Sequence, residues 1–284
     1  MRTSAISLSL LAASCTVAPS VATAPTARSA ATAQVGADCS RFVGQHVDAR
    51  NIDAVMAPFE QVGVKGEFET TAELQGRQAT AIDQLGSELI LVKPSEGREY
   101  IAYDADRRVL KISRFALHNT GLNEMALFGP GAPYEALVRS RLSSYGVVLS
   151  QDESVVGAYE ASNAFGASAT VLKVRRTTKG VYDRPADIGA QGLFPSADTS
   201  ADHIAIELPL DPMTAQRLIS NVRFAYLVEP RTPYFLSAAY GFPSTPTLSD
   251  PREVIEDVSV IYGDLQCAFV LDDNDTVLAA TPTR

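Results

Sequence analysis

Tryptophan is absent from the chain, and cysteine and histidine occur only three times each among its 284 residues. The three histidines, His46, His118 and His203, are widely separated, so no histidine pair has the close spacing that marks many metal sites. No C-x-x-C pair is present, which removes the usual signature of zinc ribbons and of thiol exchange. We therefore predict no metal site and no cofactor.

Sequence motifs for common enzyme chemistry are also missing. The chain has no G-x-S-x-G nucleophile elbow and neither of the glycine-rich phosphate-binding patterns, G-x-x-x-x-G-K-[ST] and G-x-G-x-x-G. These absences disfavour the common esterases, the P-loop enzymes and the dinucleotide-binding enzymes, and they leave no predicted catalytic residue. They do not exclude a hydrolase built from dispersed carboxylates or histidines, because glycoside hydrolysis needs only two well-placed carboxylates.

Basic residues are outnumbered, with 24 lysines and arginines against 33 acidic residues and a net charge of −9. Residues 1–33 hold two of the arginines and no acid, so their removal would bring the net charge to −11. An acidic surface repels the phosphates of nucleic acids and of anionic lipids, and we predict no nucleic-acid partner. Beyond residue 33, no apolar run has the length of a membrane-spanning helix, so we expect no transmembrane segment in the mature chain.

The N-terminal region favours export from the cytosol. It contains a short apolar run, Ala5–Ala13, that cannot span a bilayer. Ala31-Thr32-Ala33 fits the small-residue pattern of a signal-peptidase site, so we expect residues 1–33 to be a signal peptide. Ala22-Thr23-Ala24 fits this pattern less well, because Pro25 follows it.

Two other interpretations of this region remain open. Ala12-Ala13-Ser14-Cys15 resembles a lipobox, in which case the signal ends before Cys15 and Cys15 is the acylated first residue of a lipoprotein. The other is an ordinary disordered N-terminus that is rich in alanine, threonine and serine. We expect export, which places the mature chain in the periplasm, outside the cell or on a lipid anchor.

Two cysteines, Cys39 and Cys267, lie near opposite ends of the expected mature chain. In an oxidising compartment two such thiols pair more often than they stay free, so we predict a disulfide between them. The alternative is a pair of buried, unlinked cysteines that act as small apolar side chains.

One strand–helix–strand unit gives the clearest secondary-structure pattern. His203–Leu208 alternates along its length, with the two-residue period of a half-buried strand. Asp211-Pro212 predicts a helix N-cap followed by the first helical residue, and apolar residues continue at helical spacing. Val222–Val228 predicts a second strand, which Pro230 should end.

Other elements follow from the same periodicities. Helices are expected over Phe42–Phe59, over Thr71–Gly86 with a break or bend at Gly76, and over Pro133–Tyr145. Strands are expected over Leu89–Lys93, Tyr100–Tyr103, Val109–Phe115, Val147–Ser150, Val155–Tyr159, Ala167–Thr178, Val258–Tyr262 and Leu265–Leu271.

Turn-forming residues predict the connections. Gly180–Ala201 is rich in glycine, aspartate, serine and proline, which favours a long surface loop. Arg231–Asp250 is rich in proline and also favours a loop, and Pro251–Asp257 favours a helical turn capped by Asp250. Asp272–Asp275 favours a hairpin turn over a calcium site, because the glycine and the distal glutamate of an EF-hand loop are missing.

These elements predict an α+β fold, with a mainly antiparallel β-sheet and three to five short helices packed on one side. We expect residues 34–284 to form a single domain. The best candidate for an internal sub-domain boundary is the glycine- and proline-rich stretch 129–133.

Four aromatic residues lie close together in the proline-rich segment, in Pro233-Tyr234-Phe235 and in Tyr240-Gly241-Phe242-Pro243. Aromatic rings give large contact areas at binding surfaces, so the predicted binding residues are Tyr234, Phe235, Tyr240 and Phe242. The alternative is that the rings fix a loop to the core.

The sequence as a whole favours a non-catalytic exported envelope protein, periplasmic or lipid-anchored, that binds a protein or peptide partner. The alternative is an extracytoplasmic hydrolase whose site is assembled from dispersed aspartate, glutamate or histidine residues.

Overall fold

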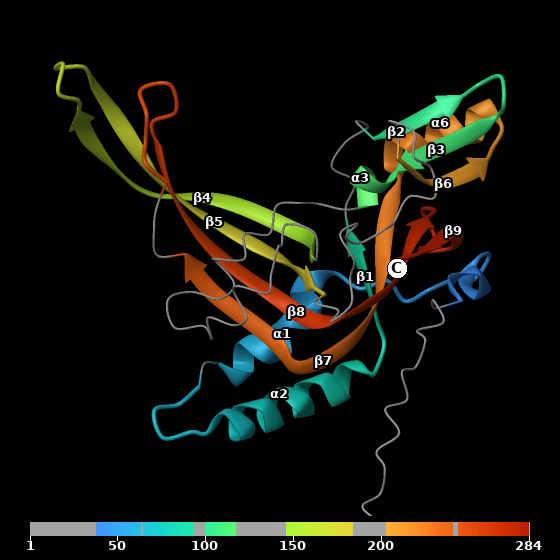
Figure 1. Cartoon of the computed structure of the whole chain (residues 1–284), viewed down its shortest axis with the longest axis horizontal. Helices are drawn as coiled ribbons and strands as arrows, with labels where there is room; N and C mark the ends of the chain where they lie inside the picture. The colour runs from blue at the N-terminus through green and yellow to red at the C-terminus, as the bar shows by residue number, and fades with distance from the viewer. Residues whose placement is uncertain are drawn as a thin grey trace, which may run out of the picture. The chain divides into compact units, whose positions relative to one another are not determined.

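β-Strands dominate the structure, and four α-helices accompany them in the part of the chain that is described (Figure 1). The computed structural model describes residues 38–63, 65–93, 100–117, 146–183, 203–240 and 244–283, apart from the side chains of 238–240. All of these residues belong to one unit, Gly36–Arg284. Outside them lie the expected signal peptide (1–33), the lipidation candidate Cys15, the expected helix Pro133–Tyr145 and the boundary near 129–133.

The larger sheet is curled and mixed (Figure 1). Its order is β1-β7-β8-β5-β4, and β9 also pairs with β8. All of these pairings are antiparallel except the one between β5 and β8. The strands are β1 (Leu89–Lys93), β4 (Gly146–Ser162), β5 (Ser168–Tyr182), β7 (Arg223–Tyr240), β8 (Arg252–Leu271) and β9 (Val277–Pro282). The α+β class is confirmed, whereas the expected antiparallel sheet is matched only in part.

A smaller antiparallel sheet has the order β2-β3-β6, with β2 at Ile101–Asp104, β3 at Val109–Ser113 and β6 at Ile204–Pro209. The β2–β3 hairpin and the β8–β9 hairpin both begin their turns with an aspartate. Asp104 accepts a hydrogen bond from the backbone N–H of Arg107, and Asp272 accepts one from that of Asn274. Aspartate stabilises such turns by accepting bonds from nearby backbone groups, so the predicted hairpin turn after Leu271 is confirmed.

The helices are divided between the two sheets. α1 (Ile52–Val62) contacts α2 (Thr71–Leu85) and β5, and α2 contacts β7. α3 (Arg114–Leu117) contacts β3 and β6 of the smaller sheet, and α6 (Pro212–Asn221) leads into β7. None of the helices in the described ranges has the length and apolar content that crossing a bilayer requires.

Local capping sets where the helices begin. Asp211 caps α6 by accepting from the N–H groups of Met213 and Thr214, each at 3.0 Å, which confirms the predicted start. Thr70 and Glu73 form a capping box at the start of α2. α2 then continues through Gly76, so the predicted break is wrong: one exposed glycine costs a helix only about 1 kcal/mol.

The predicted start of the first helix at Phe42 is also wrong. Cys39–Phe42 is a short 3-10 turn, η1, and α1 begins only at Ile52, where Asn51 accepts from the N–H of Asp53. Between them the chain turns at Val43 and Gly44 and then forms single bridges from His46 to Thr276 and from Arg50 to Leu91. Pairing with strand residues therefore replaces helix in this segment.

The main core lies between α1 and the larger sheet and continues into the smaller sheet. α1 buries the four apolar residues that its helical spacing places on one side. They are Ile52, Val55, Met56 and Phe59. The sheet contributes Leu89, Leu91, Val147, Leu149, Val181, Phe224, Tyr226, Val228 and Ile261. Burying such side chains contributes roughly 1.5–3 kcal/mol each, so this cluster anchors α1 in the fold.

Strands β7 and β8 are much longer than the sequence predicts. β7 does not end at Pro230 but continues to Tyr240, and β8 begins at Arg252, where a helical turn was expected. The register of the β7–β8 pairing shifts between Pro230 and Phe235. A proline lacks the N–H that a regular ladder uses, and this irregular stretch accommodates both Pro230 and Pro233 without ending the strand.

Along one edge of β8, the neighbouring strand changes from β5 to β9. β5 pairs with it up to Tyr262, and β9 pairs with it from Cys267 onward. Between them, the buried carboxylate of Asp183 accepts from the N–H of Leu265 at 2.9 Å. The hydroxyl of Thr283 donates to the carbonyl of Leu265. Side chains thus satisfy the backbone at the point where neither strand pairs with it.

Candidate partner-binding surface

β4 and β5 form a long hairpin, drawn in green and yellow at the upper left of Figure 1. Asn163 shapes its turn, because its side-chain oxygen accepts from the N–H groups of Phe165 and Ala167, both at 3.0 Å. Gly166 has φ +82°, a backbone conformation that favours glycine. The pairing extends from the turn to Gly146 opposite Tyr182.

We define the arm as Gln151–Ser162 of β4, the turn Asn163–Ala167, Ser168–Thr178 of β5 and Arg252–Val258 of β8. Apolar side chains on the arm are open to solvent. The exposed fraction is 63% for Val155, 52% for Val156 and 96% for Phe165 in the turn. Leu172 is also exposed. A group of exposed apolar side chains on one element is a feature of interaction surfaces, whereas isolated ones are common anywhere.

Two β-bulges interrupt β4, one between Val148 and Ser150 and one between Val155 and Gly157. The residues between them, Ser150–Val155, pair with β5 in an unbroken register. In the described part of the chain, no strand pairs with β4 on its other side. Ser150–Val155 is therefore a regular edge segment of about the usual strand length.

Charged groups of neighbouring strands pair across the arm. Glu153 accepts from Arg176 at 2.7 Å and lies 3.4 Å from Arg252 of β8. Tyr159 donates its hydroxyl to Glu253 at 2.7 Å, and this hydrogen bond to a carboxylate is the main cause of the raised pKa of Tyr159. Such cross-strand pairs hold the three strands of the arm in register.

The base of the arm is joined to α1. Lys179 of β5 donates to Asp53 at 2.8 Å and to Glu60 at 3.2 Å. Partial burial of the ammonium group lowers the pKa of Lys179, but the hydrogen bonds to the two carboxylates outweigh it and raise the pKa above its ordinary value. The helix therefore holds the sheet at the position where the arm begins.

The four aromatic residues predicted to bind a partner do not share one environment in the structure. The ring of Phe235 stacks on Phe59 of α1, with centroids 5.3 Å apart, and Tyr234 packs against the main core. The backbone of Tyr240 pairs with Glu256 in the arm, whereas Phe242 lies outside the described residues. Core packing accounts for Tyr234 and Phe235, and a contact of any of the four with a partner stays a prediction.

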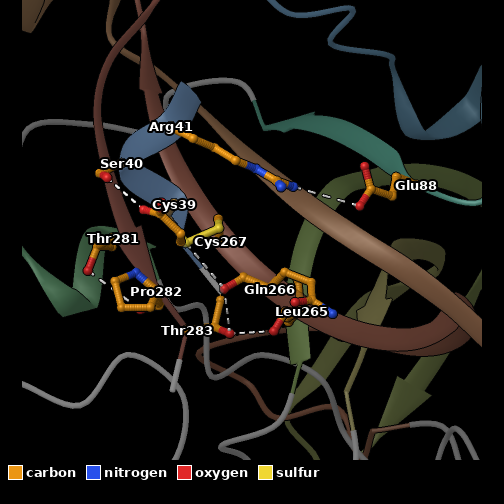
Figure 2. Close-up of a disulfide and its surroundings, with 11 residues drawn as sticks. Cys39, Ser40, Arg41, Glu88, Leu265, Gln266, Cys267, Thr281, Pro282 and Thr283 are labelled. Atoms are coloured by element: carbon orange, nitrogen blue, oxygen red, sulfur yellow. Dashed lines mark hydrogen bonds and ion pairs between the residues drawn. A yellow bond between two sulfur atoms is a disulfide. The ribbon is translucent and has the colours of Figure 1, made fainter. Parts of the chain in front are cut away.

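The predicted disulfide between Cys39 and Cys267 is present, as Figure 2 shows. Their Cα atoms lie 5.7 Å apart, although 228 positions separate them in the sequence. Both cysteines are buried in a second apolar cluster, in which the ring of Phe42 packs against that of Phe269. The bond links η1 to β8 beside Thr283, so both ends of the described chain are fastened to the same strand.

The described histidines contact different elements. His46 Nδ1 lies 2.7 Å from the carbonyl oxygen of Asn274, and the His203 ring meets that of Phe115 edge-on at 5.3 Å. His118 lies outside the described residues. Among the residues that the structure covers, no three histidine, cysteine, aspartate or glutamate side chains are grouped so that they could hold a metal ion.

Sequence reasoning did not identify the arm. The polar run Gln151–Ser154 separated two predicted short strands that are in fact one strand, β4. A usable signal was present, because the asparagine-led turn at Asn163 has extended segments of similar length on both sides. Comparison of the chain with protein-family models, with curated proteins and with solved structures finds no match.

Proposed function

We propose that this chain is an exported, non-catalytic protein that binds a protein or peptide partner through the arm. One observation carries the proposal: β4, a terminal strand of the larger sheet, has two adjacent valines, Val155 and Val156, whose side chains are more than half exposed. Long edge strands with exposed apolar residues promote association, and proteins usually shorten, charge or cover them. An exposed edge of this length is consistent with a surface that a partner covers.

The disulfide supports the exported location. Disulfides persist in oxidising compartments and are rare in the cytosol, and the bond between Cys39 and Cys267 closes a loop of most of the chain. Fractionation of cells tests this location, with detection of the processed N-terminus by mass spectrometry. Cys15→Ala should release the protein from membranes if the chain is lipid-anchored, and it should change nothing if residues 1–33 are a cleaved signal peptide. A full-length, cytosolic chain in which the thiols of Cys39 and Cys267 both react with an alkylating reagent would contradict export.

Site-specific photo-crosslinking tests the binding surface. A benzoylphenylalanine at position 156 should link the chain to a partner in the envelope, whereas the same group at Met213 of α6 should not. Met213 is a suitable control because it is apolar and highly exposed but lies outside the arm. Equal labelling from both positions, or none from position 156, would contradict the proposal.

Once crosslinking has identified the partner, the partner is purified without a crosslink and its affinity for the chain is measured. The double substitution Val155→Ser and Val156→Ser should weaken binding about tenfold, because two apolar contacts are lost. Met213→Ser should leave the affinity within about twofold. Unchanged binding by the double variant would exclude the arm as the contact surface.

The predicted aromatic residues are tested in the same assay. Tyr240→Ala should weaken binding, since the backbone of Tyr240 in β7 pairs with Glu256 of the arm. Phe242→Ala tests the residue two positions further along the chain. Tyr234→Ala should act mainly on stability, because Tyr234 packs against the core. The reverse pattern, with Tyr234 essential for affinity and Tyr240 not, would place the contact surface at the β7 irregularity instead of the arm.

A further inference from the structure

The backbone of the arm's edge strand offers hydrogen bonds as well as side-chain contacts. β4 is the last strand in the order of the larger sheet, and only its β5 side is paired within the described residues. In an antiparallel ladder each strand directs alternate N–H and C=O groups to either side. Ser150–Val155 therefore presents a short row of backbone donors and acceptors away from β5, and a partner strand can use such a row.

Charge on this edge has one sign. β4 contains Asp152, Glu153 and Glu160 and no lysine or arginine. Glu153 is compensated by Arg176 and Arg252, whereas Asp152 accepts only from the hydroxyl of Ser150 and makes no ion pair with a described residue. An added strand would lie directly against these carboxylates, so a basic strand would be attracted and an acidic one repelled.

The bulges restrict where a partner strand can lie. An added strand needs a regular register, and Ser150–Val155 is bounded on both sides by a bulge. Val155 and Val156 stand at one end of this segment and supply apolar contact. Within the described part of the chain, the segment and its neighbour Val156 thus combine an outer edge that no strand pairs with, a carboxylate that makes no ion pair and two exposed apolar side chains.

We propose, on the basis of the proposed function, that the partner contributes an extended segment in which basic and apolar residues alternate. This segment adds as a strand to the outer edge of β4 at Ser150–Val155.

A second copy of the chain is a poorer occupant of this edge. Two β4 edges would bring Asp152, Glu153 and Glu160 of one copy toward the same residues of the other, in molecules that each carry a net charge of −9. Sedimentation at rising concentration should therefore show a monomer.

Synthetic peptides provide the probe. The peptide acetyl-KVTVKVTVK-amide should bind the oxidised full chain, and its counterpart with glutamate in place of lysine should bind at least tenfold more weakly. A third peptide keeps the lysines but is N-methylated at alternate amides, which removes one row of strand hydrogen bonds. It should also bind at least tenfold more weakly. Binding of the N-methylated peptide as tight as that of the parent would show plain charge attraction and overturn strand addition.

Hydrogen exchange locates the bound peptide. Alternate amides of Ser150–Val155 should become protected when the basic peptide is present, and those of α2 should not change. Asp152→Lys should weaken peptide binding about fivefold, whereas Asp83→Lys, on an exposed position of α2, should leave it within twofold. Protection confined to another element, or no binding of the basic peptide at millimolar concentration, would overturn the inference.

The two proposals can fail separately. If the crosslinked partner loses affinity with the Val155/Val156 double variant but no β4 amide becomes protected, the arm binds its partner without strand addition. If the double variant binds the partner normally, the proposed function fails at this surface. A concentration-dependent dimer that the Val155/Val156 substitutions abolish would identify a second copy as the occupant and overturn the basic-segment proposal.

Discussion

Lys179 of β5 donates a hydrogen bond to Asp53 of α1, with 2.8 Å between Nζ and Oδ1, and this contact joins the base of the arm to the helix in the core. Lys179→Met should lower the free energy of unfolding by about 1 kcal/mol, since the carboxylates it contacts are half exposed and screened by solvent. Urea denaturation measures the change.

Lys173→Met is a matched control, because that ammonium group lies over the partly buried Tyr159 ring in the arm. Lys173→Met should change the free energy of unfolding by no more than about 0.5 kcal/mol.

The raised pKa of Lys179 sets the pH dependence of its contribution to stability. Its contribution is complete below the unfolded value of about 10.4 and disappears as the pH rises through the higher folded pKa. An equal loss for both variants at pH 7 would contradict the role of Lys179.

The disulfide should contribute strongly to stability. On the chain-entropy model, closing a loop of more than 200 residues stabilises the fold by up to about 5 kcal/mol, and removal of native disulfides commonly costs about 2–5 kcal/mol. The double variant Cys39→Ser and Cys267→Ser should unfold at correspondingly lower urea concentration. Wild type should shift to the same midpoint in reductant, and the double variant should not respond to reductant. A reductant-insensitive wild type would contradict this expectation.

Gly263 lies where the β7 and β8 backbones approach closely. A Cβ atom there would stand 2.6 Å from the carbonyl oxygen of Glu229 and 3.0 Å from Cα of Pro230. Gly263→Ala should therefore destabilise the fold by about 1–3 kcal/mol, because both neighbours are backbone atoms. Gly157→Ala is the control, since the nearest atom to its Cβ is a lysine methylene at 3.8 Å. Thermal unfolding of the two variants should differ clearly, and equal stability would contradict the close approach.

Asp272 controls the turn between β8 and β9. Partial burial raises the pKa of its carboxyl, but hydrogen bonds from the N–H groups of Thr276 and Asn274 outweigh this and hold the pKa below its usual value. Its contribution is therefore complete above the unfolded pKa of about 3.9 and lost as the pH falls through the lower folded value. Asp272→Ala should lower Tm at pH 7, and the difference from wild type should shrink toward pH 2.

Asp273→Ala, at the next position, makes a suitable comparison for Asp272→Ala, because Asp273 makes no hydrogen bond or ion pair with a described residue. It should change Tm little at either pH. A constant difference between Asp272→Ala and wild type from pH 7 to pH 2 would contradict the proposed role of the carboxylate.

Local signals predicted the parts of the fold that depend on neighbouring residues. The N-cap at Asp211 and the turn at Asp272 are decided by side chains that bond to their own backbone, so the sequence identified them. The disulfide followed from the small number of cysteines. The length of β7 and β8 could not be predicted in this way, because pairing with distant strands carries them through prolines and a charged run that favour loops or helix on local grounds.

The arm was missed for the same reason. Gln151–Ser154 has no apolar residue, yet pairing with β5 makes it strand. The parallel pairing of β5 with β8 joins segments about 80 positions apart, and nothing in either segment specifies its neighbour. The aromatic residues illustrate a further limit, since the sequence cannot distinguish a ring packed on the core, as Phe235 is, from one that meets a partner.

The proposed partner site requires that the outer edge of β4 is open to solvent, and hydrogen exchange of the free, oxidised protein measures this directly. Alternate amides of Ser150–Val156 should exchange at least 100-fold faster than those of Ala268–Leu271, which lie in the core between β7 and β9. Protection throughout Ser150–Val156 equal to that of Ala268–Leu271 would show that the chain covers this edge itself, and would contradict a partner site there.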